Sequence, residues 1–207
     1  VPEEIRSVLA RRFASLPAPT VELLQTAAVI GREFTIALLS SITKLDPTDI
    51  LQSLDEPVAS GIVIEEQTSD HDFRFSHALF REALLDLLSL SKRIALHASA
   101  VVVIGNGSDK PVPENVGTLA YHSYEAIPLI GKYPAIIHSI VAGNHALQLT
   151  AYDTAEQCFR QALDLLSDRT QTNEWAEASA GIARALRFTT TESDVGAVGP
   201  HLGNAWN

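Results

Sequence analysis

The pattern of apolar and polar positions along this chain predicts a helix within its first residues. Apolar side chains in the segment 3–16 recur at spacings of three and four, the period of an amphipathic helix. One face of this helix is expected to carry Ile5, Val8, Leu9, Arg12, Phe13 and Leu16. Pro17 and Pro19 are expected to end the helix, because a proline has no N–H to donate.

Three more helices are expected between residues 20 and 61. Thr20 is the expected cap of the first, and Gly31 its end. A short helix is predicted over 34–43. In the segment 46–61, Asp46 is the expected N-cap and Pro47 the first helical residue, because proline at this position loses no hydrogen bond.

The period of the pattern changes at 62–66 and again at 72–76. Both runs are rich in β-branched or aromatic residues, and the polar segment 67–71 joins them, which is a hairpin signal. Three short helices followed by a two-stranded wing are the element order of a winged helix. We therefore expect a winged helix over residues 20–76.

Helical patterns fill the chain again from residue 77 onward. The expected helices are 77–89, 91–104, 114–127, 132–150, 152–167 and 173–188. The first of them is expected to bury Leu79, Ala83, Leu84, Leu87 and Leu88. The segment 105–115 is rich in Gly, Pro, Asn and Asp and is expected to be a loop. Residues 189–207 lack periodicity and are expected to form an irregular tail or a partial repeat.

One stretch has the spacing of a tetratricopeptide repeat. In a 34-residue frame beginning at Ile136, Gly143, Ala155, Phe159 and Ala162 fall at offsets 8, 20, 24 and 27. Small residues at these offsets let two helices approach closely, and an aromatic ring fills the remaining space. The early aromatic residue and the closing proline of such repeats are absent. The pattern predicts antiparallel helical hairpins of this kind.

The composition agrees with a mainly helical chain. Hydrophobic residues make up 46% of the 207 residues and aromatic residues only 6%, so the core is expected to consist mostly of Ala, Leu, Ile and Val from packed helices. The expected fold class is mainly α: a winged-helix domain with a small β-hairpin, followed by antiparallel, tetratricopeptide-like helical hairpins.

The charge and the cysteine content indicate the cellular compartment and the classes of partner to expect. A net charge of −10 argues against binding to duplex DNA or to an anionic membrane, where attraction to phosphate supplies much of the affinity. No apolar run approaches the roughly 18 residues of a membrane span. The single cysteine, Cys158, fits a reducing compartment, so a cytoplasmic location is expected. The absence of methionine suggests a piece of a longer polypeptide.

Two segments carry a resemblance to a known family. The stretches "AAVIGREF", residues 27–34, and "FRFSHALFREAL", residues 73–84, resemble the region after the ATPase core in STAND-type signalling ATPases. These are large bacterial regulators with LuxR-type, adenylate-cyclase or kinase output domains. The resemblance extends over about residues 1–168 and is looser in the helical repeats.

The resemblance implies a domain organisation. Residues 1–17 would be the end of the ATPase lid, 18–90 the winged-helix domain and 91–188 the tetratricopeptide-like repeats. The chain has no G-x-x-x-x-G-K-[ST] loop, so no cofactor is expected in it, and ATP or ADP would bind an upstream domain of the parent protein. The implied partners are that nucleotide-binding domain and a protein bound by the repeats.

The same resemblance suggests a role for one histidine. In related signalling ATPases a winged-helix histidine reaches the β-phosphate of ADP, and His77 is the matching position here, with Arg74 as its neighbour. His77 is expected at the start of a helix, where N–H groups favour an anion, with Ser76 as the cap. The alternative is a histidine that only caps or packs at the strand–helix junction.

Other candidate chemistry is weak in the sequence. His138 and His145 lie two helical turns apart, but a zinc site would need histidines four residues apart and a carboxylate, as in HExxH. Cys158 lies beside Phe159 and is expected to be a buried, unreactive thiol. No nucleophile–base pair is recognisable, so the chain is not expected to be an enzyme.

A second hypothesis is a transcriptional regulator that binds DNA through the winged helix. A recognition helix needs Arg and Lys for phosphates and base edges. The third helix of the expected winged helix, within 46–61, contains four acidic residues and no basic one. This composition favours the protein-interaction hypothesis.

Overall fold

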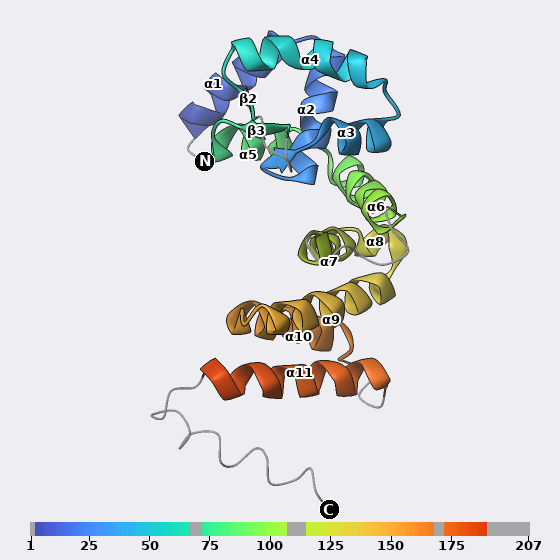
Figure 1. Cartoon of the computed structure of the whole chain (residues 1–207). Coiled ribbons are helices and arrows are strands. Elements are labelled where there is room, and N and C mark those ends of the chain that lie inside the picture. Colours follow the sequence, from blue (N-terminus) through green and yellow to red (C-terminus); the bar gives the residue numbers. More distant parts are fainter. Residues whose placement is uncertain (1–2, 67–71, 107–114, 168–171, 190–207) are drawn as a thin grey trace, which may run out of the picture. The chain divides into compact units, whose positions relative to one another are not determined.

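The computed structural model describes residues 3–66, 72–106, 115–167 and 172–189. The chain divides into two compact units, Val1–Gly107 and Ser108–Asn207, and each is described by itself. Helices dominate both units, and the strands lie in the first (Figure 1). The expectation of a mainly α chain with a small antiparallel sheet is therefore confirmed. The predicted connection 67–71, most of the loop 105–115 and nearly all of the tail 189–207 lie outside the described residues.

The first unit contains six helices and three strands within its described residues. They are α1 Glu3–Ala14, α2 Ala18–Ile30, β1 Glu33–Phe34, α3 Ile36–Thr43, α4 Pro47–Ala59, β2 Val63–Glu65, β3 Phe73–Phe75, α5 Ala78–Asp86 and α6 Leu90–Asn106. Helix α6 contacts α2 and α3. The first unit therefore includes α6, and the division between the units falls after this helix.

The starts of these helices follow local capping chemistry. Asp46 caps α4 as predicted, because its Oδ1 accepts a hydrogen bond of 2.8 Å from the Thr48 N–H. Thr20 does not cap α2, which begins at Ala18, and its side chain is buried. That prediction was wrong because Pro19 fits within the first turn, where its missing N–H costs nothing. Helix α3 begins at Ile36, since Thr35 accepts from the Leu38 N–H at 3.1 Å.

The sheet has three strands in the order β1-β3-β2, all antiparallel to their neighbours. The predicted hairpin is present as β2 and β3, but the expectation of only two strands was wrong. The third strand, β1, pairs Phe34 with Phe73 and Glu33 with Arg74. Two residues cannot show an alternating pattern, so β1 gave no signal in the sequence.

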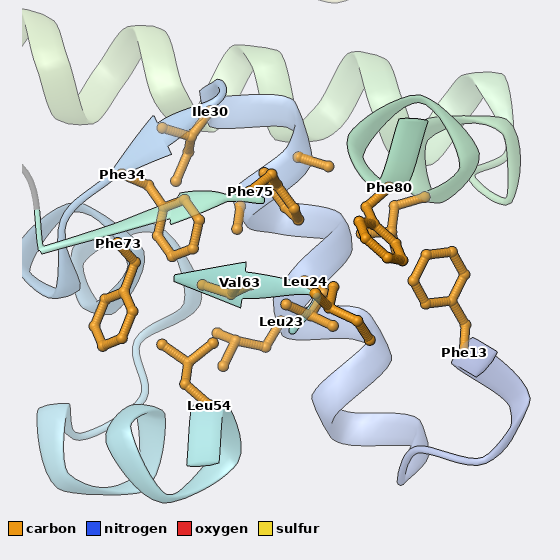
Figure 2. Packing of buried hydrophobic residues seen from close by; sticks show 14 of the residues in the cluster. Phe13, Leu23, Leu24, Ile30, Phe34, Leu54, Val63, Phe73, Phe75 and Phe80 are labelled. Atoms are coloured by element: carbon orange, nitrogen blue, oxygen red, sulfur yellow. The ribbon is translucent and has the colours of Figure 1, made fainter. Parts of the chain in front are cut away.

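The core of the first unit lies against one face of this sheet. Figure 2 shows Phe34, Phe73 and Phe75 on that face, with the ring centroids of Phe34 and Phe73 6.0 Å apart. Phe13 from α1 meets Phe80 from α5 edge to face, with centroids 6.3 Å apart. Helix α1 therefore shares this core and is held by it, as expected for aromatic pairs in contact.

The buried stripe of α5 differs from the predicted one. Ala83 and Leu84 are buried as expected, but Leu79 and Leu87 are 36% and 49% exposed. Phe80, which was not predicted, takes the place of Leu79 in the core. Phe80, Ala83 and Leu84 are three and four residues apart and lie on one face of the short helix.

The second unit consists of helices within its described residues. They are α7 Val116–Glu125, α8 Ile127–Ile130, α9 Lys132–Gln148, α10 Tyr152–Leu165 and α11 Asn173–Thr189. Helix α9 contacts α7, α10 and α11, and α10 also contacts α11. The predicted helix 114–127 corresponds to α7, and α8 was not expected as a separate turn.

Phe159 is the centre of packing in the second unit. Its ring is fully buried, together with Ala155 and Ala162 on the same face of α10. A Cβ atom at Gly143 of α9 would lie 2.8 Å from the ring, and one at Gly181 of α11 would be even closer. Glycine at both positions lets α9 and α11 approach the ring closely.

No single helix among the described residues is long and apolar enough to cross a membrane. The pair Ala78–Asp86 and Leu90–Gly105 meets the length and composition criteria only when taken together, and it is bent by 118° at its break.

Candidate functional site

The first candidate site lies at the end of β3, where Arg74 and His77 were predicted. Arg74 is opposite Glu33 of β1 and Ile64 of β2, and residues that are opposite in a sheet share a face. Phe73 and Phe75 on either side of it point into the core. Arg74 therefore lies on the outer face of the sheet, half-buried.

The charge of Arg74 already has a partner. Its Nε donates to Glu66 Oε1, and the two groups form an ion pair with 27% and 26% of their side chains exposed. Partial burial makes such a pair stronger than one in open solvent, because water screens it less. A phosphate that approached Arg74 would have to compete with the Glu66 carboxylate.

Ser76 does not cap the following helix, contrary to the prediction. Its Oγ donates to the Gly61 carbonyl at 2.6 Å, and its N–H donates to the Ile62 carbonyl at 3.0 Å. Both bonds extend the pairing of β3 with the chain before β2. The hydroxyl is satisfied there, so it is not free to turn toward α5.

His77 is itself the N-cap residue of α5. Its backbone is extended, with φ −139° and ψ 144°, and its carbonyl accepts from the Phe80 N–H at 3.1 Å. The imidazole makes no capping hydrogen bond and is exposed to solvent. Of the two predicted residues, His77 is thus the one whose side chain is available to a partner.

The structure does not bring Arg74 and His77 together as a pair. Arg74 forms an ion pair with Glu66 on the sheet, whereas His77 accepts a hydrogen bond from the Phe80 N–H through its backbone carbonyl. Within the described residues, no hydrogen bond or ion pair joins the two side chains. The N-terminus of a helix such as α5 favours an anion, because its first N–H groups and the positive end of the helix dipole lie there.

A different feature of the first unit concerns helix α4. Asp49, Asp55 and Glu56 are all exposed, and the helix contains no Lys or Arg. Its buried face consists of Ile50, Leu54 and Pro57. The solvent face of α4 is therefore strongly acidic.

The second unit contains a Ser-His contact that the sequence did not indicate. Ser123 Oγ of α7 lies 2.6 Å from His138 Nδ1 of α9. Burial lowers the pKa of His138 below its usual range. Ser123 is fully buried, so a substrate cannot reach it, and a nucleophile needs that access. The two residues lie on different helices, and only helix packing brings them together.

Metal and thiol chemistry are limited in the described part of the chain. There, no group of three His, Cys, Asp or Glu side chains is placed to hold a metal ion. Cys158 is half-buried beside Val116, Ala120 and Ala142, and burial raises the pKa of its thiol. A raised pKa leaves little thiolate near neutral pH, which makes the thiol a poor nucleophile.

Comparison of this chain with protein-family models, curated proteins and solved structures found no match.

Proposed function

We propose that this chain is a non-catalytic regulatory and protein-interaction region of a larger signal-transduction ATPase. In this proposal the first unit is a winged helix that packs on an upstream nucleotide-binding domain, which binds the ATP or ADP. The second unit is the start of a tetratricopeptide-like array that binds a protein partner. The region works in the cytoplasm, without direct contact to nucleic acid or membrane.

The order of elements in the first unit supports the winged-helix part of this proposal. Three helices, α2, α3 and α4, precede the antiparallel strands β2 and β3, and a short strand β1 between α2 and α3 completes the sheet. This is the order of a helix-turn-helix with a wing. The resemblance of residues 27–34 and 73–84 to signalling ATPases points in the same direction.

The acidic face of α4 is the main observation that favours a protein over DNA as the partner of the first unit. In a winged helix that binds DNA, the third helix enters the major groove and its Arg and Lys contact phosphates and base edges. In this chain that helix exposes Asp49, Asp55 and Glu56 and has no basic residue. Three carboxylates would repel the phosphate backbone, so the helix suits a protein surface better.

The packing around Phe159 supports the repeat part of the proposal. Helices α9, α10 and α11 contact one another through small residues, among them Gly143, Ala155, Ala162 and Gly181. Stacking of helices through small residues is how repeat proteins build a continuous surface for a partner.

His77 is the residue that we propose to report on the nucleotide. Its exposed imidazole, at the N-terminus of α5, is available to a phosphate of a nucleotide held by the adjoining domain. Arg74 would contribute only if its ion pair with Glu66 were broken, so its role in this proposal is secondary to that of His77.

The test uses the full-length parent polypeptide and fluorescent ADP. His77→Ala should weaken ADP binding by about tenfold, the loss expected for one charge-assisted hydrogen bond. His145→Ala, a histidine change in the second unit, is the matched control and should leave ADP affinity unchanged. A parent protein that binds no nucleotide, or one in which both variants bind ADP like the wild type, would refute the sensor role.

A separate titration addresses the DNA hypothesis. Fluorescence anisotropy with a labelled duplex at about 50 mM salt should show no saturable binding to this chain. Tight binding that weakens steeply as salt is added would favour the transcriptional regulator instead.

A further inference from the structure

The second unit has a groove at the ends of α9 and α11, beside the start of α10. Its volume is about 660 Å³, and its walls include Asn144, Leu147, Tyr152, Arg184, Arg187 and Phe188. A smaller hollow adjoins it around Tyr152 and Phe188. All of these residues belong to the second unit.

One side of the groove is an exposed aromatic pair. The rings of Tyr152 and Phe188 stack with centroids 4.7 Å apart and 15° between their planes. Phe188 is nevertheless 65% exposed to solvent. Stacking fixes the orientation of the two rings relative to each other. The pair offers a flat platform for an aromatic or leucine side chain.

The groove also carries two positive charges, both from α11. Arg184 Nη2 donates to Asn144 Oδ1 at 3.2 Å, and Asn144 Nδ2 donates to Glu177 Oε1 at 2.8 Å. These bonds orient Arg184 through a neutral amide and leave its other N–H groups for a ligand. Arg187, three residues further along α11, is exposed and forms no ion pair within the described residues.

Charge complementarity identifies the kind of partner. Among the described residues, Arg184 and Arg187 are the only charged side chains that line this groove, although the whole chain has a net charge of −10. Glu177 offsets part of the charge of Arg184 at one end, and Asp153 lies in the adjoining hollow. Two guanidinium groups about one helical turn apart, beside an aromatic platform, match carboxylates that flank an apolar residue.

We propose that this groove binds an acidic, extended segment of a protein partner. Two carboxylates of the segment contact Arg184 and Arg187, and an aromatic or leucine residue between them packs on Tyr152 and Phe188. This inference rests on the proposed protein-interaction role of the second unit and names the chemistry of its partner.

The experiment measures binding of a fluorescent peptide of about twelve residues to the full chain by anisotropy. The peptide contains Glu and Asp around one Phe, and its controls replace the acidic residues with Gln or the Phe with Ser. Saturable binding of the first peptide, weakened severalfold by either control and by raising salt from about 50 to 300 mM, is the expected result.

Substitutions of groove residues test whether the peptide binds in the groove. Arg184→Gln and Arg187→Gln should each weaken binding about fivefold, and Phe188→Ala by about tenfold. Arg160→Gln is the matched control: it removes the same charge from α10, where Arg160 pairs with Glu156 of its own helix, and should change nothing. Equal loss of affinity in the Arg160 variant would mean a diffuse charge effect and would overturn the proposal.

Two outcomes separate this inference from its alternatives. Glu192 and Asp194 follow α11 in the sequence. If the peptide binds only to the double variant Glu192→Gln, Asp194→Asn and not to the wild type, acidic residues of this chain occupy the groove and the proposal is wrong. If acidic peptides fail to bind, and the parent protein still shows nucleotide-dependent behaviour that His77→Ala removes, the groove proposal fails while the regulatory function stands.

Discussion

The ring of Phe159 in α10 packs directly against the backbone of Gly181 in α11, so that no space remains for a Cβ atom at that glycine. Gly143 of α9 meets the same ring, and a Cβ added there would lie 2.8 Å from it. Because the ring is fully buried in close-packed surroundings, it has little room to move aside for a methyl group.

Overpacking usually costs about 1–3 kcal/mol, and a Cβ only 2.4 Å from a buried ring belongs at the upper end of that range. Alanine in a helix interior gains about 1 kcal/mol over glycine, so Gly181→Ala should destabilise the second unit by about 1–2 kcal/mol in total. Denaturant unfolding followed by tryptophan fluorescence measures it, because both tryptophans, Trp175 and Trp206, belong to the second unit. Gly117→Ala in α7, where nothing lies within 4 Å of the added Cβ, is the control and should not destabilise. A stabilised Gly181 variant would contradict the packing.

His77→Ala should leave the stability of the first unit within about 0.5 kcal/mol of wild type, since its side chain is exposed and makes no capping bond. Phe75→Ala, two residues earlier, should cost about 3–5 kcal/mol because its ring is fully buried against Phe34. Every tyrosine and tryptophan lies in the second unit, so far-ultraviolet circular dichroism is the suitable measurement for the first. A large loss in His77→Ala would show that the histidine has a structural role.

The second unit should become less stable as pH falls below about 6.5, the usual pKa of histidine. Burial lowers the pKa of His138 in the folded state, so the unfolded state binds a proton first. The stabilisation is full above the unfolded pKa and is lost as pH falls through the folded pKa. Protonation also forces Nδ1 to donate to Ser123 Oγ, which lies 2.6 Å away. Unfolding midpoints at about pH 7.5 and pH 5 measure the effect.

His138→Gln should reduce this pH dependence, whereas His145→Gln should retain it. A pH dependence that is the same in His138→Gln and in the wild type would assign it to other groups.

Cys158 should react slowly with a thiol-specific reagent at neutral pH. Burial raises the pKa of its thiol and restricts access, so both the thiolate fraction and the encounter rate are reduced. The reaction should be several times slower than that of the same protein in denaturant, and it should speed up as pH rises toward 9. A folded-state rate equal to the denatured rate would show that the thiol is open to solvent.

The sequence anticipated the features that depend on neighbouring residues. Helices α1 to α6 follow from spacings of three and four, and the cap at Asp46 follows from the preference of carboxylates for free N–H groups. The hairpin β2–β3 follows from two short β-branched and aromatic runs. These signals are local, because hydrogen bonds within a helix or hairpin join residues close in sequence.

The sequence did not reveal the partners of polar side chains when those partners lie on another element. Ser76 had the chemistry of a cap, but Gly61, fifteen residues earlier, takes its hydroxyl bond. The sequence also did not indicate that Arg74 pairs with Glu66 across the hairpin. The sensing role of His77 and Arg74 stays a prediction, and of the two side chains only that of Arg74 has an ion-pair partner in the described residues.

The sequence by itself determined that this chain is mainly helical, acidic and built with one small hairpin, because composition and period fix these properties residue by residue. Tertiary structure alone decided which side chains meet: the third strand β1, the contact of Ser123 with His138, and the Arg184–Arg187 groove beside Phe188. The physical reason is that these arrangements bring together residues from separate elements, and only packing sets the distances between elements.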